Sequence, residues 1–224
     1  MYSHTIAFRD DETLRTGKQR TLMIYGVNRG GTTAVAGGIR RMGVFLGDDM
    51  EGNLEDKCFR FKHGLDAIRG TVAQRNADYD VWGWKHPHPH QYIDDILPEL
   101  RNPRLILVTR DMTANTLGVS SWDQEALGKG VGLYMGQTRK NVDLMWNAKC
   151  PVMLVSYEKL VLKPEAVLKE LAHFCGLNPK KALVSHAAEF IKPGAYQPEE
   201  AKALTFSEYC RHRGSLIKRR FFKR

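Results

Sequence analysis

The chain has 224 residues, enough for one α/β domain with a substantial core and hardly enough for two domains. Hydrophobic residues make up 42% and charged residues 26%, and no apolar run approaches the roughly 20 residues that cross a bilayer. The net charge is +9, but residues 211–224 carry seven positive charges and no acid, which leaves only +2 for the first 210 residues. Any argument for nucleic acid or a membrane surface therefore rests on this tail alone.

Three segments are expected along the chain: a polar lead-in over residues 1–20, a single α/β domain over 21–210 and a basic tail over 211–224. The lead-in contains no apolar signal-peptide core. The four cysteines are scattered without a C-x-x-C spacing, which predicts reduced thiols in a cytoplasmic protein.

Apolar runs predict strands that alternate with helical segments. We expect strands over residues 21–27, 43–46, 81–85, 104–109 and 152–156. We expect helices over residues 33–42, 53–75, 92–100, 113–127, 131–148 and 165–175. This alternation predicts an α/β fold with a parallel sheet flanked by helices on both faces, in which ligands bind at the carboxyl ends of the strands.

The segment over residues 22–34 reads Leu-Met-Ile-Tyr-Gly-Val-Asn-Arg-Gly-Gly-Thr-Thr-Ala, a strand that leads through a glycine-bearing turn into a helix. Gly26 and Gly31 occupy the two glycine positions of a P-loop, but Thr32 stands in place of its lysine. Backbone N–H groups and a helix N-terminus favour an anion here. The alternative is an ordinary strand-to-helix turn capped by a threonine.

Arg110 ends the strand over residues 104–109 and precedes a segment rich in small polar residues. An arginine followed by a hydroxyl on a helix forms a natural clamp for a second phosphate. The alternative is a local ion pair between Arg110 and Asp111.

Taken together, the motifs resemble those of the sulfotransferases that use 3′-phosphoadenosine 5′-phosphosulfate (PAPS), in particular the bacterial and Golgi-type members. That family's first loop reads Pro-Arg/Lys-Ser-Gly-Thr-Thr, and its later motifs are a strand ending in arginine before a serine, then Tyr-Glu-Asp-Leu, a proline-started helix and Phe-Leu-Gly-Leu. The similar stretches occur here in the same order, at residues 28–33, 105–110, 119–120, 155–160, 163–164 and 171–177.

The resemblance implies a P-loop-type fold and a donor site. The 5′-phosphosulfate would lie on the first loop, and the 3′-phosphate on an arginine, a serine and a C-terminal Arg-Lys-Gly. Thr116 and Ser121 are alternatives to Ser120, because the spacing from Arg110 is ten positions where the family usually has eight. The implied donor-binding residues are Asn28, Arg29, Gly30, Gly31, Thr32, Thr33, Arg110, Ser120, Arg213 and Gly214.

The resemblance also implies catalytic residues. Sulfuryl transfer needs cations near the leaving oxygen and a base for the acceptor proton, and Arg29 and Lys85 match the family's cations. Family members use either a histidine or a glutamate as the base, so Glu55, His86 and His88 are candidates, in that order of preference. A metal site in His-Pro-His-Pro-His (residues 86–90) is not expected, since alternation points neighbours apart, and fixed cations suffice for the transfer.

The sequence therefore predicts a cytoplasmic PAPS-dependent sulfotransferase that acts on a hydroxyl of a carbohydrate or small metabolite, without a metal and without nucleic acid. A P-loop kinase-like phosphoryl transferase and a non-enzymatic nucleic-acid-binding protein are the alternatives. The basic tail offers a possible contact with an anionic membrane surface, and a solvated terminus is the simpler interpretation.

Overall fold

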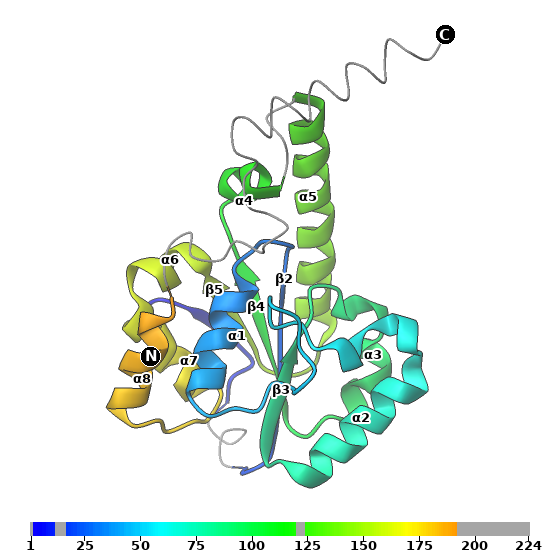
Figure 1. Ribbon diagram of the computed structural model, residues 1–224, viewed down its shortest axis with the longest axis vertical. Coiled ribbons are helices and arrows are strands. Elements are labelled where there is room, and N and C mark those ends of the chain that lie inside the picture. The colour runs from blue at the N-terminus through cyan, green and yellow to red at the C-terminus, as the bar shows by residue number, and fades with distance from the viewer. Residues whose placement is uncertain (1, 12–16, 120–123, 192–224) are drawn as a thin grey trace. The chain divides into compact units, whose positions relative to one another are not determined.

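The computed structural model describes residues 2–11, 17–119 and 124–191, which all belong to one structural unit (Figure 1). Its strands are β1 (Ile6–Phe8), β2 (Arg20–Gly26), β3 (Val81–Lys85), β4 (Pro103–Thr109) and β5 (Val152–Ser156). Its α-helices are α1 (Thr32–Arg41), α2 (Leu65–Asp78), α3 (Ile93–Ile96), α4 (Met112–Val119), α5 (Gln124–Asn147), α6 (Tyr157–Leu162), α7 (Pro164–Phe174) and α8 (Lys181–Glu189). Short 3₁₀ turns are η2 (Lys57–Phe59), η3 (Phe61–His63), η4 (Pro89–Gln91) and η5 (Leu97–Glu99).

The five strands form one sheet in the order β1-β5-β4-β2-β3. Strands β2 to β5 run parallel, and β1 pairs with β5 in the antiparallel direction at the edge. Strand β2 lies between β3 and β4, and its pairing continues to Ile24 opposite Lys85 and to Gly26 opposite Val108. The predicted α/β class with a mostly parallel sheet is therefore confirmed.

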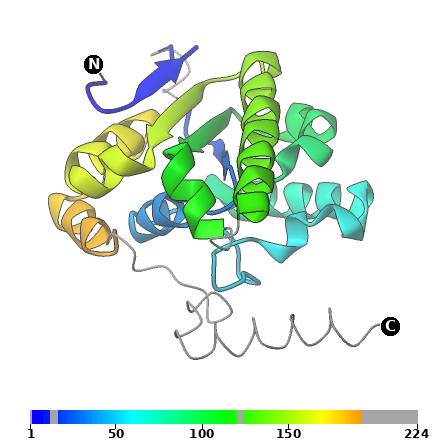
Figure 2. The same cartoon turned by 90° about the horizontal axis from the view of Figure 1, so that it is seen from above.

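Helices cover both faces of the sheet (Figures 1 and 2). Because side chains alternate along a strand, Leu22 and Ile24 of β2 pack with α1, α7 and α8, whereas Met23 and Tyr25 pack with α2, α3 and α5. Every residue of β2 is buried, as expected of a central parallel strand covered on both sides. Helix α4 and the first turns of α5 lie beyond the carboxyl ends of the strands (Figure 1).

Two predicted elements differ locally from the structure. Residues 43–46 form only a single bridge, from Phe45 to Trp82, because Gly43 and Gly47 adopt positive φ on either side and turn the chain away. The expected helix over residues 53–75 begins only at Leu65. Its first part forms turns η2 and η3, preceded by Leu54 at φ 63° and followed by Gly64 at φ 85°.

The helical hairpin over residues 112–147 divides at a different place from the one predicted. We expected a break at residues 128–130, but α5 continues through both glycines of that segment. A glycine inside a helix costs only about 1 kcal/mol, which the packing of a 24-residue helix offsets. The described part of α4 ends at Val119 and α5 begins at Gln124.

The N-terminal segment, residues 3–10, packs onto the domain through strand β1, where a polar lead-in was expected. Helices α6 and α8 were also not predicted. The expected tail over residues 211–224 lies outside the described residues. Within the described ranges, no helix combines the length and apolar character needed to cross a bilayer.

Candidate active site

The first loop (residues 26–33) joins β2 to α1 at the carboxyl edge of the sheet. Gly31 is the N-cap of α1 in the left-handed conformation, with φ 90°, and a Cβ there would lie 2.2 Å from the Tyr157 ring. Only glycine fits this position. No side chain caps α1, so the alternative of a capping threonine does not hold. The N–H groups of the first helical turn lack intrahelical acceptors, and together with the helix dipole they form a cradle that an anion fits.

Thr33 and Lys85 both donate to the carbonyl oxygen of Asn53. The Thr33 hydroxyl lies 2.9 Å from this oxygen and the Lys85 Nζ atom lies 3.2 Å from it. Asn53 belongs to the acidic loop (residues 47–56), whose last residue, Asp56, donates its N–H to the Lys85 carbonyl of β3 at 3.5 Å. These two hydrogen bonds therefore join the first loop, the end of β3 and the acidic loop at one point.

The two neighbouring acids of this loop have separate partners. Glu55 Oε1 lies 2.9 Å from Lys85 Nζ, whereas Asp56 forms an ion pair with Arg75 at 2.6 Å. The Asp56 side chain is fully buried and also accepts the Cys58 N–H. Asp56 therefore anchors the loop, and Glu55 is presented to Lys85.

Lys85 ends β3 with its side chain only 4% exposed. Burial lowers the pKa of Lys85, and the Glu55 carboxylate acts in the opposite direction. The ammonium group carries three protons, and the hydrogen bonds to Asn53 and Glu55 engage two of them. The third can reach a further acceptor without breaking either bond.

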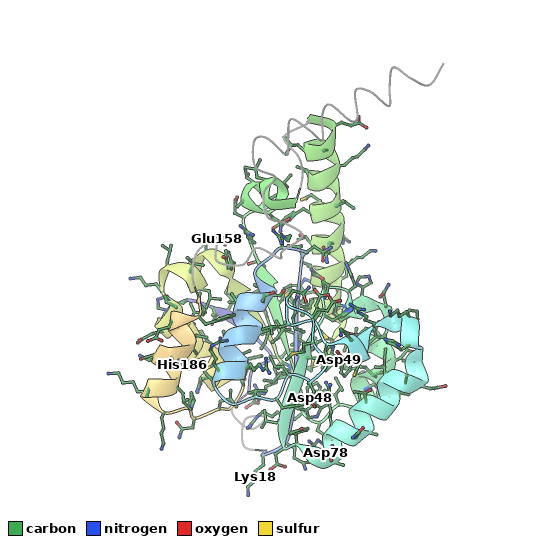
Figure 3. The ribbon with its side chains drawn as sticks, viewed as in Figure 1. Lys18, Asp48, Asp49, Asp78, Glu158 and His186 are labelled. Carbon is green, nitrogen blue, oxygen red and sulfur yellow. The ribbon has the colours of Figure 1, made fainter. Side chains whose placement is uncertain are left out.

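Arg110 follows β4 and reaches back to the first loop. Its NH1 group donates to the Arg29 carbonyl at 2.7 Å, and its guanidinium lies 5.0 Å from the centre of the Tyr157 ring. The alternative ion pair with Asp111 is not formed between these described residues: the Asp111 carboxylate accepts the Ala114 N–H at 2.8 Å, and the Asp111 N–H donates to Glu158, labelled in Figure 3. The contacts of Arg110 with a carbonyl and a ring leave its charge available at the carboxyl edge.

The three histidines after β3 occupy different environments. His86 is buried, its Nδ1 atom accepts the His88 N–H at 3.2 Å, and burial lowers its pKa to about 4. Burial also lowers the pKa of the partly exposed His88 and His90. The ring centres of His86 and His88 are 6.3 Å apart. Among the described residues, no group of three or more histidines, cysteines or acids is placed to hold a metal ion.

A cavity of about 310 Å³ lies beside the first loop, between the histidine segment (residues 86–90), α4 and α5. Amide, imidazole, phenol and ammonium groups face it together with three glycines of α5. It is lined by Val27, Asn28, His88, His90, Asn115, Gly130, Gly132, Leu133, Tyr134, Gly136, Gln137 and Lys140. A second hollow lies at the opposite edge of the sheet, near Lys18 (labelled in Figure 3) and Arg101, away from the strand ends that carry the site.

The predicted site residues that the structure describes lie along the carboxyl edge of the sheet. The first loop, Lys85, the histidines and Arg110 follow the ends of β2, β3 and β4, and Glu55 joins them through Lys85. Ser120, its substitute Ser121, Arg213 and Gly214 lie outside the described residues. Thr116 is described, is 4% exposed and belongs to α4.

Gln137 and Tyr134 of α5 had no motif to mark them. Gln137 binds backbone groups of the first loop and of the histidine segment, and the Tyr134 hydroxyl donates to the Arg110 carbonyl. Asn115, on α4, donates to the Asn28 carbonyl at 2.7 Å. The available signal was the cluster of polar residues in the helices after β4, but which of them face the loop depends on the helix packing.

Comparison with known proteins places this geometry in a class. The structure is similar to that of a mouse sulfotransferase, SULT7A1, solved with 3′-phosphoadenosine 5′-phosphate (PAP). The TM-score is 0.53 and the identity 11%, and the match covers 87% of this chain and 79% of that one. It is also similar to the sulfotransferase domain from the curacin biosynthetic pathway, with a TM-score of 0.51 and 15% identity over 75% and 77% of the two chains. At these identities the likeness shows the fold, which is the predicted P-loop type.

Residues 45–180, more than half of the chain, match the sulfotransferase family. The chain belongs to the sulfotransferase family, and the predicted class of enzyme is confirmed. A comparison with curated protein sequences gives no match. The matched range contains Glu55, Lys85 and Arg110 and begins after the first loop, so the role of that loop rests on its geometry.

Proposed function

We propose that this protein transfers a sulfuryl group from PAPS to a hydroxyl of a carbohydrate or small-metabolite acceptor. The observation that carries the proposal is the start of α1 without a side-chain cap, surrounded by cations. The Arg110 guanidinium donates to this loop from the end of β4, and Arg29 belongs to the loop itself. The Lys85 ammonium, at the end of β3, shares the Asn53 carbonyl as an acceptor with Thr33 at the start of α1. Family membership supports the type of group transferred.

The first loop would hold the 5′-phosphosulfate, and Arg110 with a hydroxyl from the following helix would hold the 3′-phosphate. Arg213 and Gly214 are proposed as further contacts to that phosphate. In the transfer, the acceptor oxygen forms a bond to sulfur while the bond from sulfur to the bridging phosphate oxygen breaks. That oxygen keeps the electron pair, and Arg29 and Lys85 stabilise its developing charge.

We assign to His88 the role of the general base that takes the proton from the acceptor hydroxyl. His88 lines the cavity, and because burial lowers its pKa the ring is neutral at pH 7 and can accept a proton. His86 is less suited, since its Nδ1 atom is engaged and the neutral ring then carries its proton on Nε2. Glu55 is bound to Lys85, and we assign it the role of holding that lysine.

The cavity is proposed as the acceptor site. Its lining offers the amides of Asn28 and Asn115 and the phenol of Tyr134, groups that pair with hydroxyls. This lining favours a polar, hydroxyl-bearing acceptor over an apolar one. A cytoplasmic location is proposed as well, because the three described cysteines are free.

Calorimetry with PAP, Mg·ATP and a DNA duplex separates the proposal from its alternatives. We expect saturable binding of PAP and neither of the others at comparable affinity. Binding of Mg·ATP without binding of PAP would overturn the proposal in favour of a kinase-like enzyme. Binding of the duplex alone would favour a nucleic-acid-binding protein.

A further inference from the structure

The side chain of Gln137, in the middle of α5, binds three backbone groups at once. Its Oε1 atom accepts the Asn28 N–H at 2.9 Å. Its Nε2 atom donates to the Gly26 carbonyl at 3.2 Å and to the Pro87 carbonyl at 3.1 Å. One side-chain amide thus joins the first loop to the histidine segment.

These contacts begin where the sheet ends. The β2–β3 ladder ends with Ile24 opposite Lys85, followed by a last hydrogen bond from the His86 N–H to the Ile24 carbonyl at 3.1 Å. Beyond this point Gly26 still pairs with Val108 of β4, but the β2–β3 ladder no longer supplies a donor for the Gly26 and Pro87 carbonyls. Gln137 supplies both carbonyls with a donor and so continues the connection between the two segments past the sheet.

We propose that Gln137 is a positioning residue that fixes the distance between the sulfuryl-donor loop and His88. The proposal rests on the proposed function, in which the first loop binds the donor and His88 accepts the proton. The His88 Nδ1 atom lies 3.4 Å from Gln137 Nε2, so a shift of this amide moves the histidine segment as well as the loop.

The location of Gln137 distinguishes positioning from ordinary core packing. Gln137 lines the cavity, and its loop partner Asn28 is exposed, so these bonds lie at a site and not within the core. Asn115 of α4 holds the Asn28 carbonyl at 2.7 Å, while Gln137 of α5 holds the Asn28 N–H. The loop is therefore held from two helices, and of these two side chains Gln137 also reaches the histidine segment. A misplacement of about 1 Å between reacting groups costs about 10²-fold in rate.

Two variants and one control test this role. Gln137→Met keeps the length of the side chain and removes all three hydrogen bonds. Gln137→Glu keeps an acceptor for the Asn28 N–H but places a carboxylate against the Gly26 and Pro87 carbonyls. Arg139→Met is the control, because Arg139 is exposed on the same helix and pairs with Asp143, one turn further along α5.

Backbone amide hydrogen exchange gives a readout that is independent of activity. In Gln137→Met we expect faster exchange in residues 26–33 and 86–90 and unchanged exchange in β4 and α7. In Gln137→Glu we expect faster exchange in residues 86–90, with the Asn28 amide still protected. Unchanged exchange in both segments of Gln137→Met would overturn the proposal that Gln137 holds the two segments together, whatever the enzyme's substrate.

Kinetics test the positioning role itself. In Gln137→Met we expect kcat to fall about 10²-fold, with the KM for the acceptor and the Kd for PAP unchanged and the Arg139→Met control like the wild type. A loss that only follows the fraction of unfolded protein, or an unchanged kcat, would leave Gln137 a structural residue and overturn the proposal. Absence of transfer by the wild type would instead count against the proposed function, and the exchange result would stand.

Discussion

The N-terminal segment and the carboxyl edge of the sheet handle charge in different ways. In the N-terminal segment, a charged side chain either pairs with an opposite charge or accepts several hydrogen bonds. Asp10 pairs with Arg104 at 3.0 Å with both side chains buried, and Glu170 accepts the N–H groups of Ser3, His4 and Thr5. This region is built for stability.

At the carboxyl edge, apart from the ion pair between Lys85 and Glu55, the side chains hold backbone groups. Arg110, Asn115 and Gln137 donate to carbonyls of the first loop. Such bonds fix the loop without neutralising the charge of Arg110, and the start of α1 has no side-chain cap. The carboxyl edge therefore keeps positive potential and open space for a ligand, at some cost in stability. Substitutions in the two regions should therefore separate stability from activity.

Arg104→Met should have the largest effect and should act on stability alone. It leaves the Asp10 carboxylate buried, 3% exposed, without its guanidinium. We expect the free energy of unfolding, measured in urea, to fall by about 3–5 kcal/mol, while kcat of the folded enzyme stays unchanged. If Arg104→Met is no more destabilising than the exposed Arg139→Met control, the N-terminal segment does not have this role.

Arg29→Asn should show the opposite pattern. Arg29 has φ 60°, a conformation that asparagine tolerates, so the substitution removes the charge and spares the backbone. We expect kcat for sulfuryl transfer to fall about 10²–10³-fold with little change in Tm. Arg40→Asn, an exposed arginine of α1, is the matched control and should behave as the wild type. Undiminished turnover in Arg29→Asn would remove Arg29 from the leaving-group site.

Glu170 makes the N-terminal segment sensitive to acid. Burial alone raises the pKa of Glu170, but the hydrogen bonds from Thr5, Ser3 and His4 outweigh it and lower the pKa to about 2. The folded-state pKa lies below the unfolded value of about 4.5, so this stabilisation is complete above about pH 4.5 and is lost as the pH falls towards 2.

Glu170→Gln should therefore lower the free energy of unfolding by about 1.5 kcal/mol at pH 7. It should also flatten the pH dependence of stability below pH 4.5 in chemical denaturation. Glu165→Gln, an exposed acid on the same helix α7, serves as the control. An equal acid dependence in the wild type and Glu170→Gln would contradict this account of the segment.

Substitution of two glycines of α5 should have the smallest effect and tests the position of the acceptor site. No described atom lies within 4 Å of a Cβ built on Gly128 or Gly136, and only Gly136 lines the cavity. Both Gly→Ala changes should raise stability by about 0.5–1 kcal/mol through helix propensity. Gly136→Ala should also raise the KM for the acceptor about tenfold, and Gly128→Ala should not. Equal kinetics in the two variants would place the acceptor elsewhere.

The sequence predicts the strands that carry the site better than the site's internal contacts. Strands β2, β4 and β5 are continuous apolar runs. Because the carboxyl ends of parallel strands lie at the same edge of a sheet, this pattern predicts that Arg29 and Arg110 lie near each other. The loop glycines marked the start of α1 in the same way.

Other features depend on tertiary packing that no local pattern encodes. Glu55 and Asp56 are neighbours in sequence, yet the buried Arg75 binds Asp56, and Lys85 receives Glu55. Gln137 is one polar residue in a long helix, and its role follows from the rotation of α5 against the strand ends. The continuity of α5 through its glycines likewise reflects packing over propensity.

Transfer of radiolabelled sulfuryl from PAPS tests most directly the claim that the carboxyl edge is a phosphosulfate site. The wild type should move the label onto a hydroxyl-bearing acceptor and release one PAP for each labelled product, and Arg29→Asn should not. Arg104→Met, assayed where it is folded, should transfer as the wild type does. Label that appears only as free sulfate at the uncatalysed rate, across a panel of carbohydrate and small-molecule acceptors, would contradict the account.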